Sequence, residues 1–165
     1  MRTRGSLIVA ALGLALHGLG PSQAKAQALI ADLSVRVAGY AQLWEEMEIR
    51  KAAAELRAIW VLGNEYLQAQ QPWAVFKTNP ARAGAIVRCA LNLVALYGVL
   101  ARPFIPDASA AIAAAMGADR TEWPDNVARA MTALAPGHAF TVPANLFAKI
   151  TDDDREEMAA RFAGS

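Results

Sequence analysis

The sequence contains one cysteine and only two histidines, His17 and His138, among its 165 residues. One cysteine cannot form an internal disulfide, and so few cysteines and histidines cannot build a typical zinc site. Valine and isoleucine are scarce, whereas alanine, the best helix former, supplies 38 residues. These features exclude a disulfide-rich scaffold, count against an all-β sandwich and favour helices.

The motifs of common catalytic sites are also missing. The sequence has neither a Gly-rich phosphate-binding loop nor a G-x-S-x-G nucleophile motif. Cys89 belongs to an apolar helical stretch, which favours a core residue over a nucleophile. His17 lies in an apolar run and His138 follows Pro-Gly, and neither has an acid beside it. We therefore assign no catalytic residue, metal ligand or cofactor to this chain.

The overall charge is nearly balanced, with 16 basic and 15 acidic residues. A net charge of +1 gives no global argument for a nucleic-acid partner. Between Tyr66 and Pro106, however, there are bases and no acid: Lys77, Arg82, Arg88 and Arg102. Two interpretations stay open here, a face that binds a polyanion and a set of charges that flank an apolar helix.

The first 26 residues differ from the rest of the chain. Two arginines precede an apolar run from Leu7 to Leu19, and small residues follow at Ala24 and Ala26. This layout is typical of a secretory signal peptide, although the alternative is the remnant of a helix. The run is shorter than the roughly 20 residues of a membrane span, so we expect no membrane partner.

The spacing of apolar residues predicts an all-α antiparallel bundle. The first helix runs from Gln27 through Trp44, with a break near Glu46, and Pro72 interrupts the second. Asn79 is the predicted N-cap of an apolar helix typical of a bundle centre. The later predicted helices are 48–69, 80–101, 106–116 and 124–134.

The tail completes a three-part organisation. Residues 1–26 form the atypical N-terminal segment, 27–150 the bundle, and 151–165 a C-terminal tail helix. The segment from Phe140 to Ile150 alternates loosely and is expected to be extended. Thr151 is the predicted N-cap of the tail helix, because three aspartates follow it where the helix dipole favours acids.

One tryptophan stands at a predicted helix junction. Pro72 ends the preceding helix, which places Trp73 outside the apolar stripe, with Asn64 and Lys77 nearby in the sequence. Such an aromatic can stack on an unstacked base, a contact worth about 1–3 kcal/mol. The alternative is a tryptophan that fills a gap in the core.

The segment from Gly63 to Lys77 resembles the anticodon-binding domain of bacterial methionine–tRNA ligase. It contains the Asn-x-Tyr of Asn64, then Pro72-Trp73, and then a lysine four residues later. The resemblance extends over roughly 28–163. The other segments that carry it are Asn79-Pro80-Ala81-Arg82-Ala83, Leu100 to Pro106, Pro136-Gly137-His138, and Leu146 to Ile150.

The resemblance implies a fold of the class I aminoacyl-tRNA synthetase anticodon-binding type. It implies a cytoplasmic module whose partner is the tRNA(Met) anticodon loop. Trp73 would stack against the CAU anticodon, and Pro72 would set the angle of Trp73. Asn64 and Lys77 would contact the loop or hold its site.

The sequence also departs from that family. The H-I-G-H and K-M-S-K-S motifs of the catalytic half, which uses ATP and Mg²⁺, are absent, so this chain alone is not expected to aminoacylate. Residues 1–26 contain no asparagine for the family's Asn-x-x-x-Arg pair, which leaves anticodon selectivity open. This absence favours a truncated or frame-shifted gene start over a signal peptide.

Three hypotheses follow from the sequence. The first is a tRNA-binding module that contributes to methionyl-tRNA synthesis. The second is a docking subunit whose partner is a separate catalytic chain. The third is an exported helical protein, which requires residues 1–24 to be a true signal peptide.

Overall fold

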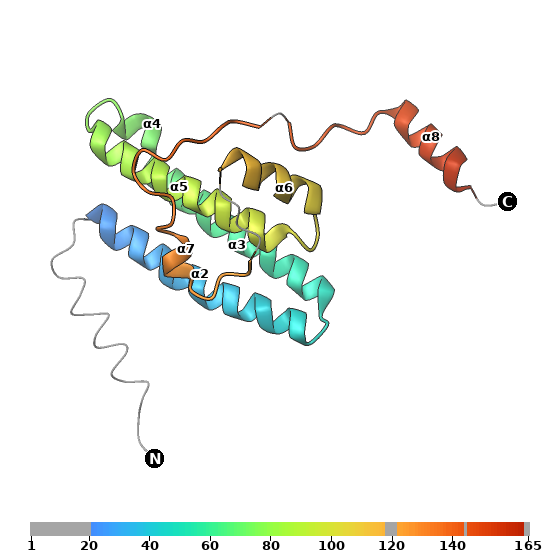
Figure 1. Cartoon of the computed structure of the whole chain (residues 1–165), viewed down its shortest axis with the longest axis horizontal. Coiled ribbons are helices and arrows are strands. Elements are labelled where there is room, and N and C mark those ends of the chain that lie inside the picture. The colour runs from blue at the N-terminus through green and yellow to red at the C-terminus, as the bar shows by residue number, and fades with distance from the viewer. Residues whose placement is uncertain (1–20, 118–121, 144, 164–165) are drawn as a thin grey trace, which may run out of the picture.

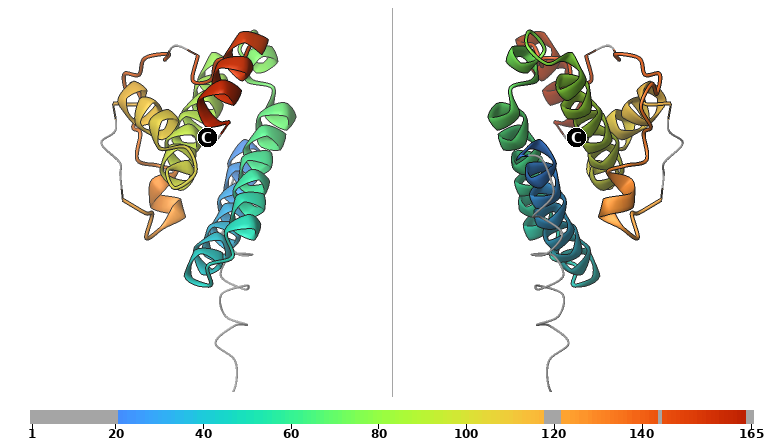
Figure 2. Two further views of the ribbon diagram at one scale, coloured as in Figure 1. Left: turned by 90° about the vertical axis from the view of Figure 1, so that its right-hand side faces the viewer. Right: turned by 90° about the vertical axis from the view of Figure 1, so that its left-hand side faces the viewer.

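The computed structural model describes residues 21–117, 122–143 and 145–163, and within them it contains helices and no strand (Figure 1). Helices α2 (Pro21–Glu45) and α3 (Ile49–Gln70) form an antiparallel pair, and α5 (Pro80–Ala101) lies beside α3. Figure 2 shows α2 and α3 as one layer and α5 with α6 (Pro106–Ala115) and α7 (Val127–Ala130) as the other. The all-α prediction is confirmed.

Local signals set most of the helix ends. Helix α2 ends at Glu45, and the chain turns through Met47, whose φ is 57°, so the predicted break near Glu46 is confirmed. Asn79 caps α5 as predicted, since its side chain accepts a hydrogen bond from the Arg82 backbone N–H at 3.0 Å. Pro80 then occupies the first turn, where a missing N–H costs nothing.

The first helix begins at Pro21 rather than at Gln27. Ala26 packs against the core, so part of the segment that looks like a cleavage site belongs to the bundle. The basic start and the whole apolar run lie in residues 1–20, outside the described residues. The signal-peptide and gene-start interpretations are therefore not tested there.

The core lies between the two layers. Its most buried large side chains come from α2, α3 and α5, and Tyr40 is among them. The Tyr40 hydroxyl donates to the Leu100 carbonyl at 2.8 Å, and the Tyr40 ring stacks on Trp123 with centroids 5.3 Å apart. An ion pair of 2.8 Å between Arg36 and Glu55 links α2 to α3 at the surface.

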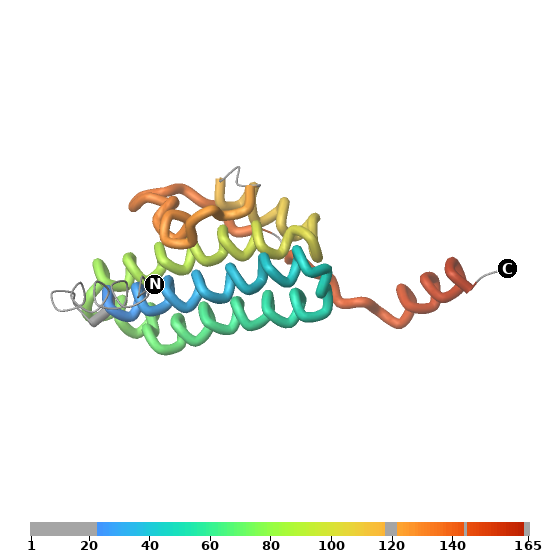
Figure 3. The backbone as a smooth tube through the Cα atoms, turned by 90° about the horizontal axis from the view of Figure 1, so that it is seen from below, coloured from blue at the N-terminus to red at the C-terminus, as the bar shows by residue number. Residues whose placement is uncertain are grey.

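Helix α5 is the centre of the molecule and contacts α3, α4 and α6. It is long and apolar enough to cross a membrane by length and composition. Its central position accounts for that composition, because helices pack against several of its sides. Figure 3 shows α2, α3 and α5 side by side along the long axis.

The segment after α6 differs from the prediction. A helix was expected over 124–134, but α7 covers only Val127–Ala130. The buried Asn92 of α5 accepts from the Leu134 N–H at 2.8 Å and donates to the Leu134 carbonyl at 3.4 Å. Asn92 thus takes the Leu134 N–H, which a longer helix would have bonded to the carbonyl four residues earlier.

The expected extended segment forms no strand between its described residues, 140–143 and 145–150. Its first part is held to the end of α6, because the Thr141 N–H donates to the Ala115 carbonyl at 2.8 Å. Just before it, the His138 Nε2 lies 2.6 Å from the Met116 carbonyl, to which it can only donate. His138 therefore has a structural contact here.

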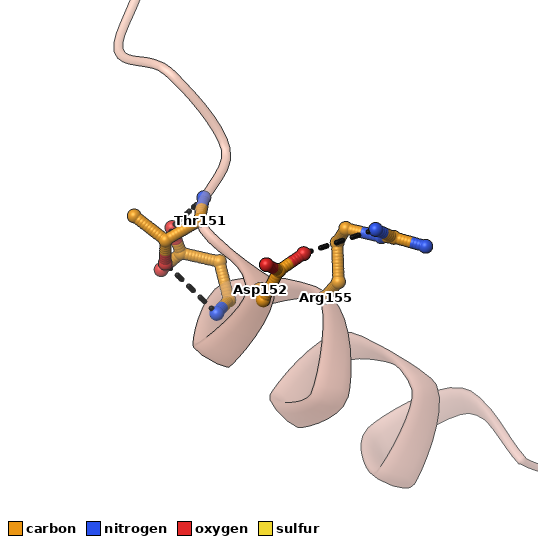
Figure 4. Close-up of polar contacts among 4 residues, drawn as sticks. Thr151, Asp152 and Arg155 are labelled. Atoms are coloured by element: carbon orange, nitrogen blue, oxygen red, sulfur yellow. Dashed lines mark hydrogen bonds and ion pairs between the residues drawn. The ribbon is translucent and has the colours of Figure 1, made fainter.

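Helix α8 (Asp152–Phe162) stands away from the bundle and has no buried residue (Figures 1 and 3). Thr151 caps it as predicted: its hydroxyl accepts from the Asp154 N–H at 3.2 Å, and the Asp154 carboxylate accepts from the Thr151 N–H at 2.8 Å. Figure 4 shows this cap and the ion pair of 3.1 Å between Asp152 and Arg155. These carboxylates therefore have a local role in starting the helix.

Candidate nucleic-acid interface

The junction between α3 and α4 (Pro72–Val75) is a sharp, rigid turn. Gln71 adopts a left-handed conformation with φ 45° and ψ 60°, and its N–H donates to the Leu67 carbonyl at 2.9 Å. Pro72 follows as the first residue of α4, with its φ fixed by the ring. The prediction that Pro72 interrupts the helix is confirmed, and the direction of α4 is set by two constrained residues.

Trp73 projects from this junction into solvent, with 57% of its surface exposed. Phe76 is 64% exposed, and Lys77 is exposed beside it in the sequence. The turns continue past α4, since the Phe76 N–H donates to the Pro72 carbonyl at 2.9 Å. Residues at spacings of three and four therefore share one face, which brings Trp73, Phe76 and Lys77 together. The core-filling alternative for Trp73 is wrong.

A polar pair lies at the base of the same junction. Gln70, the last residue of α3, is only 2% exposed, and its Oε1 accepts from the Arg82 Nη2 at 3.5 Å. The Gln70 Nε2 is buried and has no hydrogen-bond partner among the described residues. The pair joins the end of α3 to the first turn of α5.

Tyr66 of α3 and Cys89 of α5 lie near this pair, where the two helices pack together. Burial raises the pKa of the Tyr66 hydroxyl, the neighbouring Cys89 raises it further, and the Arg82 guanidinium lowers it. Burial also raises the pKa of the Cys89 thiol. Both groups are therefore uncharged at neutral pH, and Cys89 has the core environment that the sequence predicts.

The four bases of the acid-free stretch do not form one patch. Arg82 and Arg102 are separated by about 30 Å along α5, given a rise of 1.5 Å per residue. Arg88 lies about 240° around the helix from Arg82 and lines a cavity of about 440 Å³ with His138. Of the four bases, Lys77 and Arg82 are thus the two associated with the junction.

Asn64 is exposed on α3, about 200° around the helix from the buried Tyr66. No hydrogen bond joins Asn64 to Trp73 or Lys77 within the described part of the chain. Lys77 thus shares the face of Trp73 by helical spacing, whereas no described contact links Asn64 to that face.

Three residues at this junction are not among the four predicted site residues: Phe76, Arg82 and the buried Gln70. The sequence could have indicated Phe76, because it follows Trp73 by three residues, a spacing that places both on one face of a helical turn. Arg82 was noted only as one base among four. Gln70 has no signal in the sequence, because its burial depends on the packing of α3 against α5.

The fold and this surface together define a class. Exposed aromatic side chains beside cations are a feature of surfaces that bind single-stranded nucleic acid. A family model described as the anticodon binding domain of methionyl tRNA ligase matches residues 18–165. The chain belongs to this family.

The names of individual relatives agree with this family assignment. The chain is 57% identical over 146 residues to a methionine–tRNA ligase of Dinoroseobacter shibae, a match that covers 88% of the chain and 25% of the relative. It is 58% identical over 138 residues to a methionine–tRNA ligase of a Ruegeria species, covering 84% of the chain and 24% of the relative. The chain thus spans about a quarter of the length of these curated relatives. Neither comparison supports the exported-protein hypothesis.

Proposed function

We propose that the chain binds the anticodon loop of tRNA(Met) through the face of Trp73, Phe76 and Lys77. The observation that carries this proposal is the 57% exposure of Trp73 on a junction fixed by Gln71 and Pro72. A large aromatic side chain so exposed lacks a role in the core, and a rigid base gives it a defined direction for stacking.

The four residues of the predicted site have distinct roles in this proposal. Trp73 stacks on a base of the CAU anticodon, and Pro72 sets its angle. Lys77 supplies positive charge on the same face and attracts the nucleotide chain. Asn64 lies outside this face, so in the proposal it contacts a neighbouring part of the loop.

In this proposal, the catalytic half of a methionine–tRNA ligase carries out the chemistry. In the proposal, this bundle contributes tRNA recognition to methionyl-tRNA synthesis in the cytoplasm, and a catalytic half supplies the sites for ATP, Mg²⁺ and methionine. Support comes from the length of the relatives, of which the chain spans about a quarter. The absence of H-I-G-H and K-M-S-K-S from the sequence agrees with it.

The catalytic half could be joined to this chain or encoded separately, and the exposed tail is a candidate contact for it. Four apolar side chains in the tail and in the segment just before it are at least half exposed: Phe147, Ile150, Met158 and Phe162. Contiguous exposed apolar surface is a feature of protein interfaces, and these side chains are candidates for such a surface. We expect purified catalytic half of a relative to bind the chain, and Phe147→Ala with Phe162→Ala to weaken that binding in a pull-down.

The test of RNA binding compares two anticodon stem-loops, one with CAU and one with a changed anticodon. Loss of stacking predicts that Trp73→Ala weakens binding of the CAU loop by about 1–3 kcal/mol, roughly 5- to 150-fold. Trp73→Phe should retain part of the affinity, because a smaller ring still stacks. Fluorescence anisotropy at fixed salt measures both variants.

Phe147→Ala is the matched control for RNA binding, because it removes an exposed aromatic ring that lies 74 positions after Trp73 in the sequence. Equal affinity of the wild type for both loops, together with no loss in Trp73→Ala, would contradict the proposal. Discrimination between the loops would show that this chain selects the anticodon without the Asn-x-x-x-Arg pair.

A further inference from the structure

Gln70 is unusual because it is a buried amide of which only one of the two polar atoms has a hydrogen-bond partner among the described residues. It is 2% exposed, and its Nε2 has no partner among the described residues. An apolar side chain of the same shape would avoid the desolvation of that NH₂ group. The atom that has a partner is Oε1, whose contact is the Arg82 guanidinium at 3.5 Å. The structure thus points to Arg82 as the reason for a glutamine at this position.

One end of the Arg82 guanidinium contacts Gln70, and its other N–H groups remain available for a ligand. A guanidinium has five N–H donors in a rigid fork, and the contact with Gln70 uses one end of it. The residue is exposed, and no ion pair is formed by Arg82 within the described ranges. No acid occurs in the sequence between Tyr66 and Pro106 to neutralise it locally.

The position of Arg82 favours an anionic ligand. It lies in the first turn of the 22-residue helix α5, where the helix dipole adds positive potential. Its side chain reaches back to the residue three positions before Trp73. A nucleotide whose base stacks on Trp73 is joined to a phosphate on each side of its sugar, so a cation near the junction can contact the same stretch of RNA.

We propose that Arg82 is a further RNA-contacting residue beside this face, which binds a backbone phosphate next to the base stacked on Trp73, and that Gln70 is its positioning residue. Arginine suits this role because its fork matches two phosphate oxygens. The inference rests on the proposed function, since it requires RNA on the face of Trp73.

The experiment measures the affinity of the full chain for the CAU stem-loop at several KCl concentrations. Arg82→Gln should weaken binding about tenfold at low salt, equally for both anticodons, and lower the salt slope by about 1. Arg82→Lys keeps the charge but loses the fork, so its slope should stay near that of the wild type. Arg50→Gln, at an exposed position in the first turn of α3, is the matched control and should change neither quantity.

Gln70→Met separates positioning from charge. It removes the amide but keeps a side chain of similar length, so the bundle should be as stable as the wild type or more so. With Arg82 no longer held, binding should weaken about two- to fivefold while the salt slope is unchanged. A role of Gln70 in folding alone would instead lower stability and leave the affinity of the folded protein unchanged.

The outcomes distinguish this inference from the proposed function. If the wild type does not bind the stem-loop, or Trp73→Ala binds as well as the wild type, the proposed function fails. If Trp73→Ala loses affinity but Arg82→Gln retains both affinity and salt slope, only the present inference is overturned. If Arg82→Gln loses discrimination between the anticodons while its salt slope is unchanged, Arg82 contacts base edges rather than a phosphate, and the present inference is also overturned. Should Arg82→Gln fail to fold, Arg82→Lys and Gln70→Met decide between these outcomes.

Discussion

Gly63 and Tyr97 meet where α3 crosses α5, and the contact depends on the missing side chain of the glycine. A Cβ atom at position 63 would overlap the Tyr97 hydroxyl and would lie 3.2 Å from a Leu93 methyl group. The same hydroxyl donates to the Ile59 carbonyl at 3.2 Å. The close approach of the two helices, which supports the junction beyond them, is therefore set at a single residue.

Gly63→Ala should lower the free energy of unfolding by about 1–3 kcal/mol, because the added methyl group forces Tyr97 out of its position. Urea unfolding followed by circular dichroism measures the change. Adding Tyr97→Phe to Gly63→Ala should recover part of the loss, since it removes the atom that clashes.

Gly39→Ala in α2 is the control for this prediction, because nothing lies within 4 Å of a Cβ atom there. It should stabilise the protein by about 0.4–1 kcal/mol through helix propensity and a less flexible unfolded chain. Equal effects of the two glycine substitutions would contradict the steric explanation.

At the scale of elements, α8 is independent of the bundle. Its helical start comes from the cap of Thr151 and Asp154, and none of its residues is buried. The contacts that stabilise it are therefore local. The other helices, in contrast, place residues in the common core or against α5.

Removing residues 151–165 should change the free energy of unfolding of the bundle by less than about 0.5 kcal/mol. Scanning calorimetry of the shortened and full chains measures this. The substitution Thr151→Ala should reduce the helical signal of the tail and leave the main transition in place. A loss of several kcal/mol on removal would mean that the tail packs on the bundle in solution.

At the scale of the whole molecule, all three tyrosines are tied into the packed interior. Burial raises the pKa of Tyr40 and Tyr66, and it raises the pKa of Tyr97 to about 12. Each folded pKa lies above the unfolded value of about 10. Their contribution to stability is therefore complete below pH 10 and is lost as the pH rises through the folded pKa.

The bundle should lose stability between about pH 10 and 12, in step with ionisation of its tyrosines. Absorbance of tyrosinate and urea unfolding, both measured across this range, test the link. Tyr97→Phe should reduce the steepness of the loss, because one of the three ionising groups is gone. Tyrosines that titrate near pH 10 without unfolding would contradict the prediction.

The sequence by itself determined the features that depend on neighbouring residues. The break after α2, the Asn79-Pro80 start of α5, the interruption at Pro72 and the cap at Thr151 follow from backbone geometry and capping within a few positions. The family was also recognisable from short motifs in order along the chain. The roles of Trp73, Pro72, Asn64 and Lys77 in binding remain predictions.

Only the tertiary structure decided what depends on residues distant in the sequence. It left Trp73 in solvent rather than in the core, and it buried Gln70 against Arg82, 12 positions away. It also shortened the helix expected over 124–134, because Asn92 captures the backbone of Leu134 across 42 positions. Such contacts form when packing brings separate helices together, and local spacing carries no information about them.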